Sequence, residues 1–190
     1  MINSKLISKA TFYNKSGTKD TTTLTEVASM NQTHSNVVLE IEKSGVYDAD
    51  ALITTKKNLM LVVSTADCMP VVISDSSRIG IIHIGWKGIE NKIFFKAIKN
   101  FDRNKLKVSI GPHAKACCYE IQDDLSNKFP DYTVVREEKK FLNLSDDIVL
   151  FCKKNNIELE IANECTIGDE MFHSYRREKT SLRQESTIWM

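Results

Sequence analysis

Short runs of branched apolar residues dominate the middle of the chain. They read VVLEIE (37–42), NLMLVVS (58–64) and PVVIS (70–74), and turn formers such as SDSSR (74–78) bound them. Runs of this length and composition are typical of β-strands. Around SDSSR the pattern predicts one strand out, a turn, and one strand back.

Two segments show helical spacing instead. From Ile89 to Phe101 the apolar residues recur at steps of three and four, which places them on one face of an amphipathic helix. A second helix is predicted from Ser145 to about Asn155. The hydroxyl of Ser145 can cap free backbone amides, and the two aspartates that follow complement the positive helix end.

The rest of the pattern adds strands rather than helices. KLKVSI (105–110), IELEI (157–161) and ESTIWM (185–190) are further predicted strands, whereas residues 1–30 are mostly polar and predict an edge hairpin or a loose arm. The chain has no internal repeat and no linker rich in Pro or Gly. Residues 1–190 are therefore predicted to form a single α+β domain with mixed β-sheets flanked by helices.

Charge and cysteine content narrow the classes of partner and compartment. The 190 residues carry 26 Lys and Arg against 25 Asp and Glu, so the net charge of +1 gives no field that attracts nucleic acid or an anionic membrane. Five cysteines, two of them adjacent, suit free thiols in a reducing compartment, so the predicted location is the cytoplasm. No window approaches the roughly eighteen apolar residues that a membrane span requires, and the N-terminus lacks the apolar stretch of a signal peptide.

Three residues of types that commonly bind soft metals stand at predicted junctions between elements. His34 precedes a strand, Cys68 lies just before Pro70 at the start of another, and His83 lies just before the first helix. Two histidines and one cysteinate form a three-ligand zinc set, which leaves a fourth tetrahedral position for water or substrate, as in catalytic zinc sites. Their spacing matches no short zinc motif, so it does not establish a metal by itself.

Two other interpretations use the same atoms. In the first, Cys68 is a thiolate nucleophile and His83 is its base, which is the pairing of cysteine hydrolases. In the second, Cys68 is a small buried hydrophobe and the histidines are hydrogen-bonded structural residues. Spacing alone does not choose among the three.

The segment SIGPHAKACCYEI (109–121) holds Cys117, Cys118 and Glu120 close together. Because successive residues of a strand face opposite ways, an extended strand here points only alternate side chains into one site. Glu120 is a candidate general acid or base. The alternative is a solvated or ion-paired carboxylate on the surface.

Two cationic positions suit an anionic substrate group. Arg176 and Arg177 in HSYRRE carry forked guanidinium groups that match phosphate or carboxylate, although a charged, solvated surface is the commoner explanation. Lys87 lies in GWKG, where the free backbone amides of a helix start add to its charge.

Taken together, these segments resemble one protein family. TADCMPVVISD, IHIGWKG, SIGPHAKACCYEI and CTIGDEMFHSYRRE, with QTHS upstream, are similar in order and spacing to the motifs of the laccase-domain family. That family was long labelled multicopper polyphenol oxidase and is now described as purine nucleoside phosphorylase. An ordered set of five motifs is far more specific than any one of them.

The resemblance implies a metal centre, a fold and substrates. It places a metal ion, zinc with copper as the alternative, on His34, Cys68 and His83. It implies a cytoplasmic α+β fold similar to that of a deamidating bacterial toxin with a Cys–His pair. The implied partners are a purine nucleoside and phosphate, in the phosphorolysis of adenosine, inosine, guanosine and methylthioadenosine, with deamination of adenosine as a further reaction. A bacterial branch is linked to editing of peptidoglycan precursors.

The chain departs from the family pattern at several positions. Ser35 stands where the family has glycine, and Lys87 stands where it has arginine, which keeps the charge but loses bidentate phosphate binding. His173 replaces a phenylalanine. A glycine-rich block near the start of the family has no recognisable counterpart in residues 1–30.

The predicted mechanism combines these residues. The zinc site holds water or a substrate group, Lys87 and Arg176 orient phosphate, and Asp67 or Glu120 moves protons. One alternative is a metal-free cysteine hydrolase or amidase that edits peptidoglycan precursors, and another is a non-catalytic metal-binding domain. A multicopper oxidase fits poorly, because several copper centres need more histidines than the four in this chain.

Overall fold

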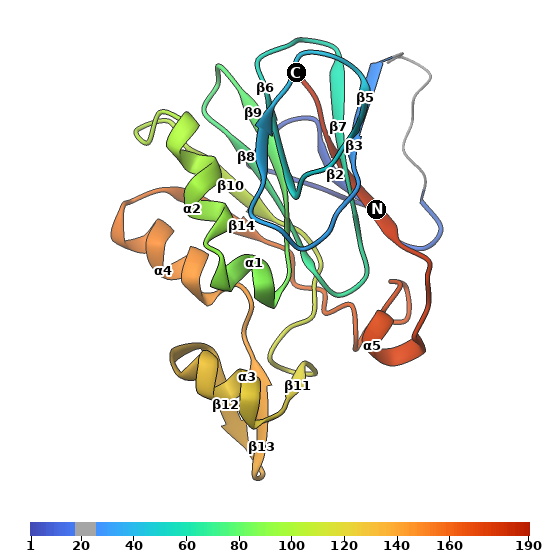
Figure 1. The fold of residues 1–190 in the computed structure, drawn as a ribbon, viewed down its shortest axis with the longest axis vertical. Helices are drawn as coiled ribbons and strands as arrows, with labels where there is room; N and C mark the ends of the chain where they lie inside the picture. Colours follow the sequence, from blue (N-terminus) through green and yellow to red (C-terminus); the bar gives the residue numbers. More distant parts are fainter. Residues whose placement is uncertain (18–25) are drawn as a thin grey trace.

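The computed structural model describes residues 1–17 and 26–190, and these residues form three layers. A layer of helices covers one face of an inner sheet, and an outer sheet covers the other face (Figure 1). A small three-stranded sheet extends below these layers in the same view. The predicted α+β class with mixed sheets and flanking helices is confirmed.

The inner sheet is buried on both faces. In its strand β8, Val71 and Ile73 pack into the core beneath the helices, whereas Val72 packs into the core shared with the outer sheet. Two-sided burial explains why the strands read as continuous apolar runs instead of an alternation. In spatial order the strands are β14 (Glu158–Ile161), β10 (Lys107–Ile110), β8 (Met69–Ser74), β9 (Ile79–Ile84), β6 (Ala51–Thr54) and β4 (Val38–Glu40).

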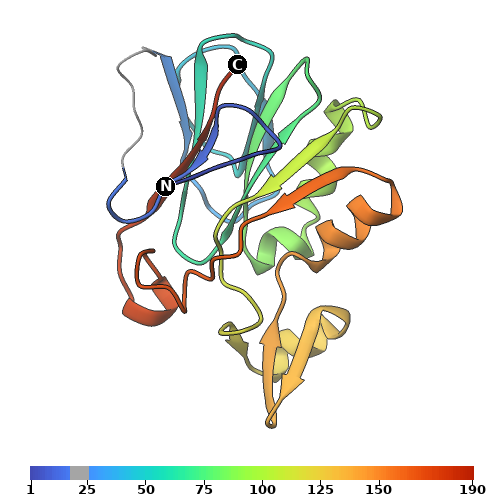
Figure 2. The same cartoon turned by 180° about the vertical axis from the view of Figure 1, so that it is seen from behind.

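The outer sheet pairs strands from the N-terminal and C-terminal parts of the chain, β2 and β15, which lie side by side when the molecule is seen from behind (Figure 2). β1 and β2 form an antiparallel pair at one edge, and Phe12 is buried, so this part of the polar N-terminal segment is packed. The part of that segment at 18–25 lies outside the described residues. The strands, in spatial order, are β1 (Ile2–Asn3), β2 (Ala10–Phe12), β15 (Gln184–Ile188), β7 (Leu59–Thr65), β3 (Glu26–Met30) and β5 (Gly45–Tyr47).

The helix predicted over 89–101 is broken, so that prediction is wrong as a single element. Lys92 has φ 56°, the left-handed conformation that commonly ends a helix. The break separates two short helices, and it lets both Ile89 and Ile93 reach the core of the inner sheet. The segment consists of α1 (Trp86–Glu90), α2 (Ile93–Ala97) and the 3-10 turn η1 (Ile98–Asn100).

The second predicted helix is confirmed as α4 (Asp146–Lys154), which buries Ile148 and Cys152. Its predicted cap is not confirmed, because the hydroxyl of Ser145 accepts no backbone N–H of the helix and instead donates to Asn143 Oδ1. No helix in the described part of the chain is long and apolar enough to cross a membrane. The remaining elements are β11 (Glu120–Ile121), β13 (Lys139–Leu142) and β12 (Thr133–Arg136) of the small sheet, with α3 (Asp123–Lys128), η2 (Pro130–Tyr132) and α5 (Tyr175–Glu178).

The predicted hairpin around SDSSR is present as β8 and β9. The carboxylate of Asp75 closes its turn by accepting the backbone N–H groups of Ser77 and Arg78 at 3.0 Å each. The register places Pro70 directly opposite His83. The fifteen positions between Cys68 and His83 are therefore one strand out, a turn, and one strand back.

Candidate metal centre

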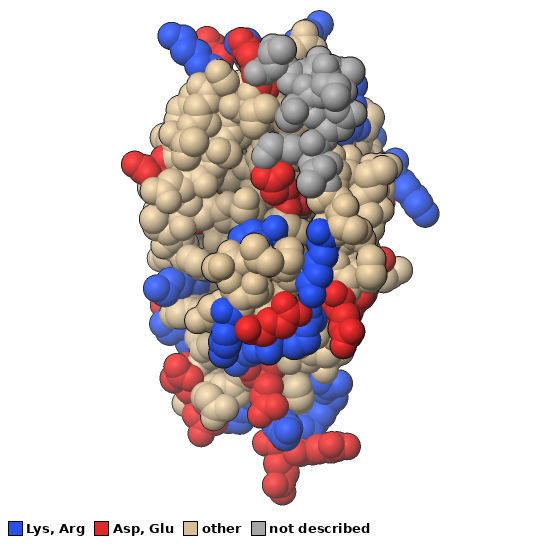
Figure 3. All heavy atoms as spheres, turned by 90° about the vertical axis from the view of Figure 1, so that its right-hand side faces the viewer, with Lys and Arg blue, Asp and Glu red and all other residues tan. Residues whose placement is uncertain are grey.

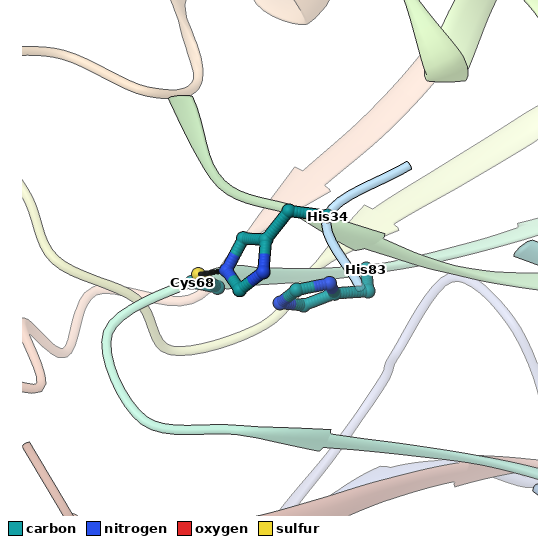
Figure 4. A group of neighbouring side chains, drawn as sticks. All are labelled: His34, Cys68 and His83. Atoms are coloured by element: carbon teal, nitrogen blue, oxygen red, sulfur yellow. Dashed lines mark hydrogen bonds between the residues drawn. The ribbon is translucent and has the colours of Figure 1, made fainter. Parts of the chain in front are cut away.

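Three segments far apart in the sequence bring His34, Cys68 and His83 together (Figure 4). His34 lies in the loop between β3 and β4, Cys68 lies in the turn from β7 to β8, and His83 lies in β9. Their ligand atoms are all within 4.8 Å of one another. The two imidazole rings meet edge to face, with centroids 4.8 Å apart.

The geometry of this group fits a tetrahedral zinc ion. His34 Nε2 lies 3.6 Å from Cys68 Sγ. A zinc ion with bonds of about 2.1 Å to nitrogen and about 2.3 Å to sulfur separates those atoms by about 3.6 Å at a tetrahedral angle. His83 Nδ1 is engaged by Asp50, which leaves Nε2 as the ring nitrogen for a ligand bond. The three side chains thus supply donors of the right kind, and His34 and Cys68 lie at the separation that a shared zinc ion requires.

Asp50 organises the site, although sequence reasoning did not select it. Its fully buried carboxylate lies 2.7 Å from His83 Nδ1 and accepts the backbone N–H groups of Thr33, His34 and Ser35. It also accepts the hydroxyl of Ser35, the residue that departs from the family pattern. Such a carboxylate fixes the tautomer and orientation of a ligating histidine. The one available signal was a charged residue directly before the apolar run ALIT.

The protonation of the site follows from these contacts. Burial raises the pKa of the Cys68 thiol, but hydrogen bonds and charges from His34 and His83 outweigh it and lower the pKa to about 6. Burial lowers the pKa of His83, whereas Asp50 and Cys68 raise it, to about 9. Burial also raises the pKa of Asp50, but its hydrogen bonds with His83 and Ser35 hold it well below the ordinary range. Cys68 is therefore a thiolate at neutral pH, the form that binds metals and attacks electrophiles.

Gly85 allows the close approach of the three side chains. A Cβ added at Gly85 would lie 2.9 Å from Cys68 Sγ and 3.2 Å from His34 Cδ2. The first distance is too short for unbonded atoms. Packing at the site therefore requires a glycine at position 85.

The three residues line a pocket of about 710 Å³. This volume is in the range of pockets that bind small molecules. Its other walls combine aromatic and cationic side chains. They include Trp86, Tyr119, Tyr175, Arg176, Lys179 and Arg183.

Asp67 and Arg176, two of the predicted catalytic residues, line this pocket. Asp67 Oδ1 accepts the hydroxyl of Thr166 at 2.8 Å, and Oδ2 accepts the backbone N–H of Arg176 at 2.6 Å. The guanidinium of Arg176 lies 5.0 Å from the centre of the Tyr119 ring. Asp67 thus joins the β7–β8 turn to α5, and Arg176 is held beside an aromatic wall.

Lys87 and Glu120, the other two, are not among the residues that line the pocket. Lys87 is exposed on α1, with its ammonium 5.6 Å from the centre of the Trp86 ring. Glu120 forms an exposed ion pair with Lys139 of the small sheet. The sequence placed Lys87 at a helix start and Glu120 as a carboxylate near Cys118, but neither side chain reaches the pocket.

Arg177 has a structural environment. Its guanidinium donates to the backbone carbonyls of Thr166, Ile167 and Phe172 and pairs with Glu178. It holds the loop before α5 in place. Cations that sequence reasoning missed, Lys179 and Arg183, line the pocket instead.

Charges of both signs are intermixed on the side of the molecule that carries α5, mainly over its lower half (Figure 3). This agrees with the net charge of +1. Cations near the pocket therefore act locally, on a small bound anion, rather than as part of a broad basic surface.

Several known proteins that are named purine nucleoside phosphorylase are similar to this chain in sequence. A purine nucleoside phosphorylase of Clostridium acetobutylicum is 35% identical over 181 residues, which cover 86% of this chain and 76% of the relative. A second, from Aquifex aeolicus, is 30% identical over 163 residues and covers 83% of this chain and 79% of the relative.

Solved structures share the fold. The YfiH protein of Bacillus licheniformis superposes with a TM-score of 0.76 at 23% identity, over 86% of this chain and 74% of that one. A Neisseria meningitidis protein gives the same TM-score at 26% identity, over 87% and 75%. The family described as multi-copper polyphenol oxidoreductase laccase matches residues 10–190, and the chain belongs to it.

Proposed function

We propose that the protein is a zinc-dependent purine nucleoside phosphorylase that also deaminates adenosine. The observation that carries the proposal is one pocket that holds the His34, Cys68 and His83 donor set together with Arg176. The relatives' names supply the reaction class. The proposed nucleosides are adenosine, inosine, guanosine and methylthioadenosine, and the proposed second substrate is phosphate.

His34, Cys68 and His83 would hold the zinc ion. When bound, the ion supplies Lewis-acid chemistry, which polarises an oxygen or nitrogen held against it. Asp50 keeps His83 in the tautomer that presents Nε2. Copper is the alternative ion for the same donors.

Arg176, Lys179 and Arg183 would bind and orient phosphate. The forked guanidinium of Arg176 suits bidentate contact with two phosphate oxygens. In phosphorolysis a phosphate oxygen bonds to C1′ of the ribose while the bond from C1′ to the base breaks, so holding phosphate in line supplies much of the rate. Asp67 would position Arg176 through its backbone N–H rather than move a proton, since both carboxylate oxygens already accept hydrogen bonds.

The aromatic wall would bind the purine. Trp86, Tyr119 and Tyr175 offer ring faces for stacking. Burial raises the pKa of Tyr119 and outweighs the opposing effect of Arg176, so its phenol keeps its proton at neutral pH. A protonated phenol can donate a hydrogen bond to a purine nitrogen as the base departs.

Turnover by the zinc-loaded protein tests the proposal. Adenosine, inosine, guanosine and methylthioadenosine are each incubated with phosphate, and chromatography detects the free base, the phosphorylated sugar and, from adenosine, inosine. Wild type and Cys152→Ala, a thiol buried in α4 away from the pocket, are expected to be active, whereas His34→Ala is expected to lose zinc and activity together. Absence of turnover for all four nucleosides by protein with bound zinc would overturn the purine assignment.

A metal-free cysteine hydrolase is the second candidate, because Cys68, His83 and Asp50 also have the geometry of a nucleophile, a base and an orienting carboxylate. Zinc analysis of protein purified without added metal separates the two. Stoichiometric zinc that disappears in His34→Ala supports the metal enzyme. A zinc-free chain with peptide amidase activity, abolished by alkylation of Cys68, supports the hydrolase.

A further inference from the structure

A second group of potential metal ligands lies outside the His34 site. The sulfurs of Cys117, Cys118 and Cys165 are all within 4.8 Å of one another, and those of Cys117 and Cys118 are 3.3 Å apart. All five cysteines of the chain carry free thiols. This three-thiol cluster shares no residue with the pocket described above.

The local fold explains why adjacent cysteines converge. Residues 116–118 form a turn, not the extended strand considered from the sequence, so the alternation of a strand does not apply. Cys118 N–H donates to the carbonyl of Lys115 at 3.0 Å, which closes the turn. Both sulfurs of the turn therefore face one region.

Cys165 comes from a different part of the chain, the loop after β14. A parallel β-bridge between His113 and Cys165 aligns this loop with the one that carries the turn. The backbone N–H of Lys115 donates to Cys165 Sγ at 3.4 Å, a contact that favours a thiolate. Gly168 leaves room for the cluster, since a Cβ there would lie 3.2 Å from Cys118 Sγ.

We propose that Cys117, Cys118 and Cys165 form a trithiolate site for a thiophilic metal ion, Zn²⁺ or Cu⁺. Two sulfurs bound to one zinc ion at about 2.3 Å are about 3.8 Å apart. The Cys117–Cys118 separation of 3.3 Å is somewhat below this value and no separation in the cluster exceeds 4.8 Å, so small side-chain rotations suffice. Soft thiolates select these ions, and the exposed Cys117 gives an entry path.

The cluster links two loops that also reach the pocket. Tyr119, which follows Cys118, lines the pocket, and Thr166, which follows Cys165, donates to Asp67. An ion held by all three sulfurs would therefore fasten these loops to each other beside the pocket. The site is independent of the nature of the reaction in the pocket, because it rests on other ligands.

Metal retention in a variant that lacks the first site tests the proposal. His34→Ala/Cys68→Ser protein is dialysed against Zn²⁺ in one arm and against Cu⁺ with glutathione in the other, then desalted and analysed for metal. We expect one ion per chain to remain in at least one arm, and further substitution Cys165→Ser to remove it. The matched substitution Cys152→Ala, a thiol outside the cluster, should leave it bound.

Two further measurements separate loss of the metal site from misfolding of the Cys165→Ser variant. Cys117→Ser, at an exposed position, gives a second variant that should fold and should weaken retention. X-ray absorption should show three sulfur neighbours, with one lighter atom added for Zn²⁺ and none for Cu⁺, and the ion should protect all three cysteines from alkylation. Failure to retain either ion, or retention unchanged in both serine variants, would overturn the proposal without affecting the phosphorylase assay.

Discussion

At the scale of single residues, Asp50 contributes more to the site than its sequence position suggests. It accepts hydrogen bonds from the loop that carries His34 and holds the ring of His83 from β9. One carboxylate thus holds both the backbone of His34 and the ring of His83. A charge buried this completely is stable only with such a full set of partners.

Replacing this charge while keeping its shape should weaken metal binding. Asp50→Asn removes the charge that orients His83, and loss of such a partner typically costs about 10–100-fold in metal affinity. Zinc affinity is measured by competition with a chromophoric chelator. Asp48→Asn, an exposed neighbour bonded to Asn31, serves as the control and should bind zinc as wild type does. An unchanged affinity in Asp50→Asn would show that His83 needs no orienting carboxylate.

Gly85 gives a steric test of the same centre. Gly85→Ala places a methyl group 2.9 Å from Cys68 Sγ and 3.2 Å from His34 Cδ2, so the arrangement of these two side chains must change. We expect zinc content to fall well below one ion per chain at this site while circular dichroism stays that of wild type. Gly88→Ala in α1 is the control, because the atoms nearest to its added Cβ are methyl carbons of Ile84 and Ile93 at 3.3 Å and the backbone carbonyl of His83 at 3.7 Å, not the His34 or Cys68 side chains. Full zinc content in Gly85→Ala would contradict the close packing of the site.

At the scale of elements, sequence patterns predict those strands, helices and turns whose formation depends on residues close together in the chain. The β8–β9 hairpin follows from two apolar runs and a turn rich in Ser and Asp, and its register brings Cys68 beside His83. The break at Lys92 was not predictable from spacing, because apolar steps of three and four continue through it. Likewise, Cys117 and Cys118 lie in a turn rather than a strand, and a β-bridge aligns the loop that carries this turn with the distant Cys165 loop.

The stability of the turn between β8 and β9 should depend on Asp75. Burial raises the pKa of Asp75, but the N–H of Asp102 and hydrogen bonds from Ser77 and Arg78 outweigh it and hold the pKa below its ordinary value. Asp75→Asn loses the charge behind these bonds, which should cost about 1–3 kcal/mol of the free energy of unfolding. Urea unfolding at neutral pH measures this loss.

The pH dependence follows from the lowered pKa of Asp75. Its stabilisation is fully present above the unfolded pKa of about 3.9 and is lost as pH falls through the lower folded value. The gap in stability between wild type and Asp75→Asn should therefore narrow in acid. Asp124→Asn, an exposed aspartate of α3, should show almost no gap at neutral pH. A gap that is constant with pH would mean that the charge of Asp75 is not involved.

At the scale of the whole molecule, the site lies where several distant segments meet. The sequence predicted His34, Cys68 and His83, because His and Cys are scarce in this chain, are common metal ligands, and stand here near the ends of elements. It did not predict Asp50, Lys179 or Arg183, since ordinary charged residues gain a role only through tertiary contacts. For the same reason it assigned Lys87 and Glu120 to a pocket that they do not line.

Asp67 joins the β7–β8 turn to Thr166 and to α5. Its removal tests whether these contacts contribute to phosphate binding. Asp67→Ala breaks the contacts with Thr166 and with the backbone of Arg176, so α5 and its guanidinium should shift. We expect the KM for phosphate to rise about tenfold, or roughly 1.4 kcal/mol, with a smaller change for the nucleoside and zinc content unchanged. Glu170→Gln, exposed in the loop before α5, is the control. A lower KM for phosphate would instead mean that Asp67 acts mainly by repelling the anion, and the positioning role would be wrong.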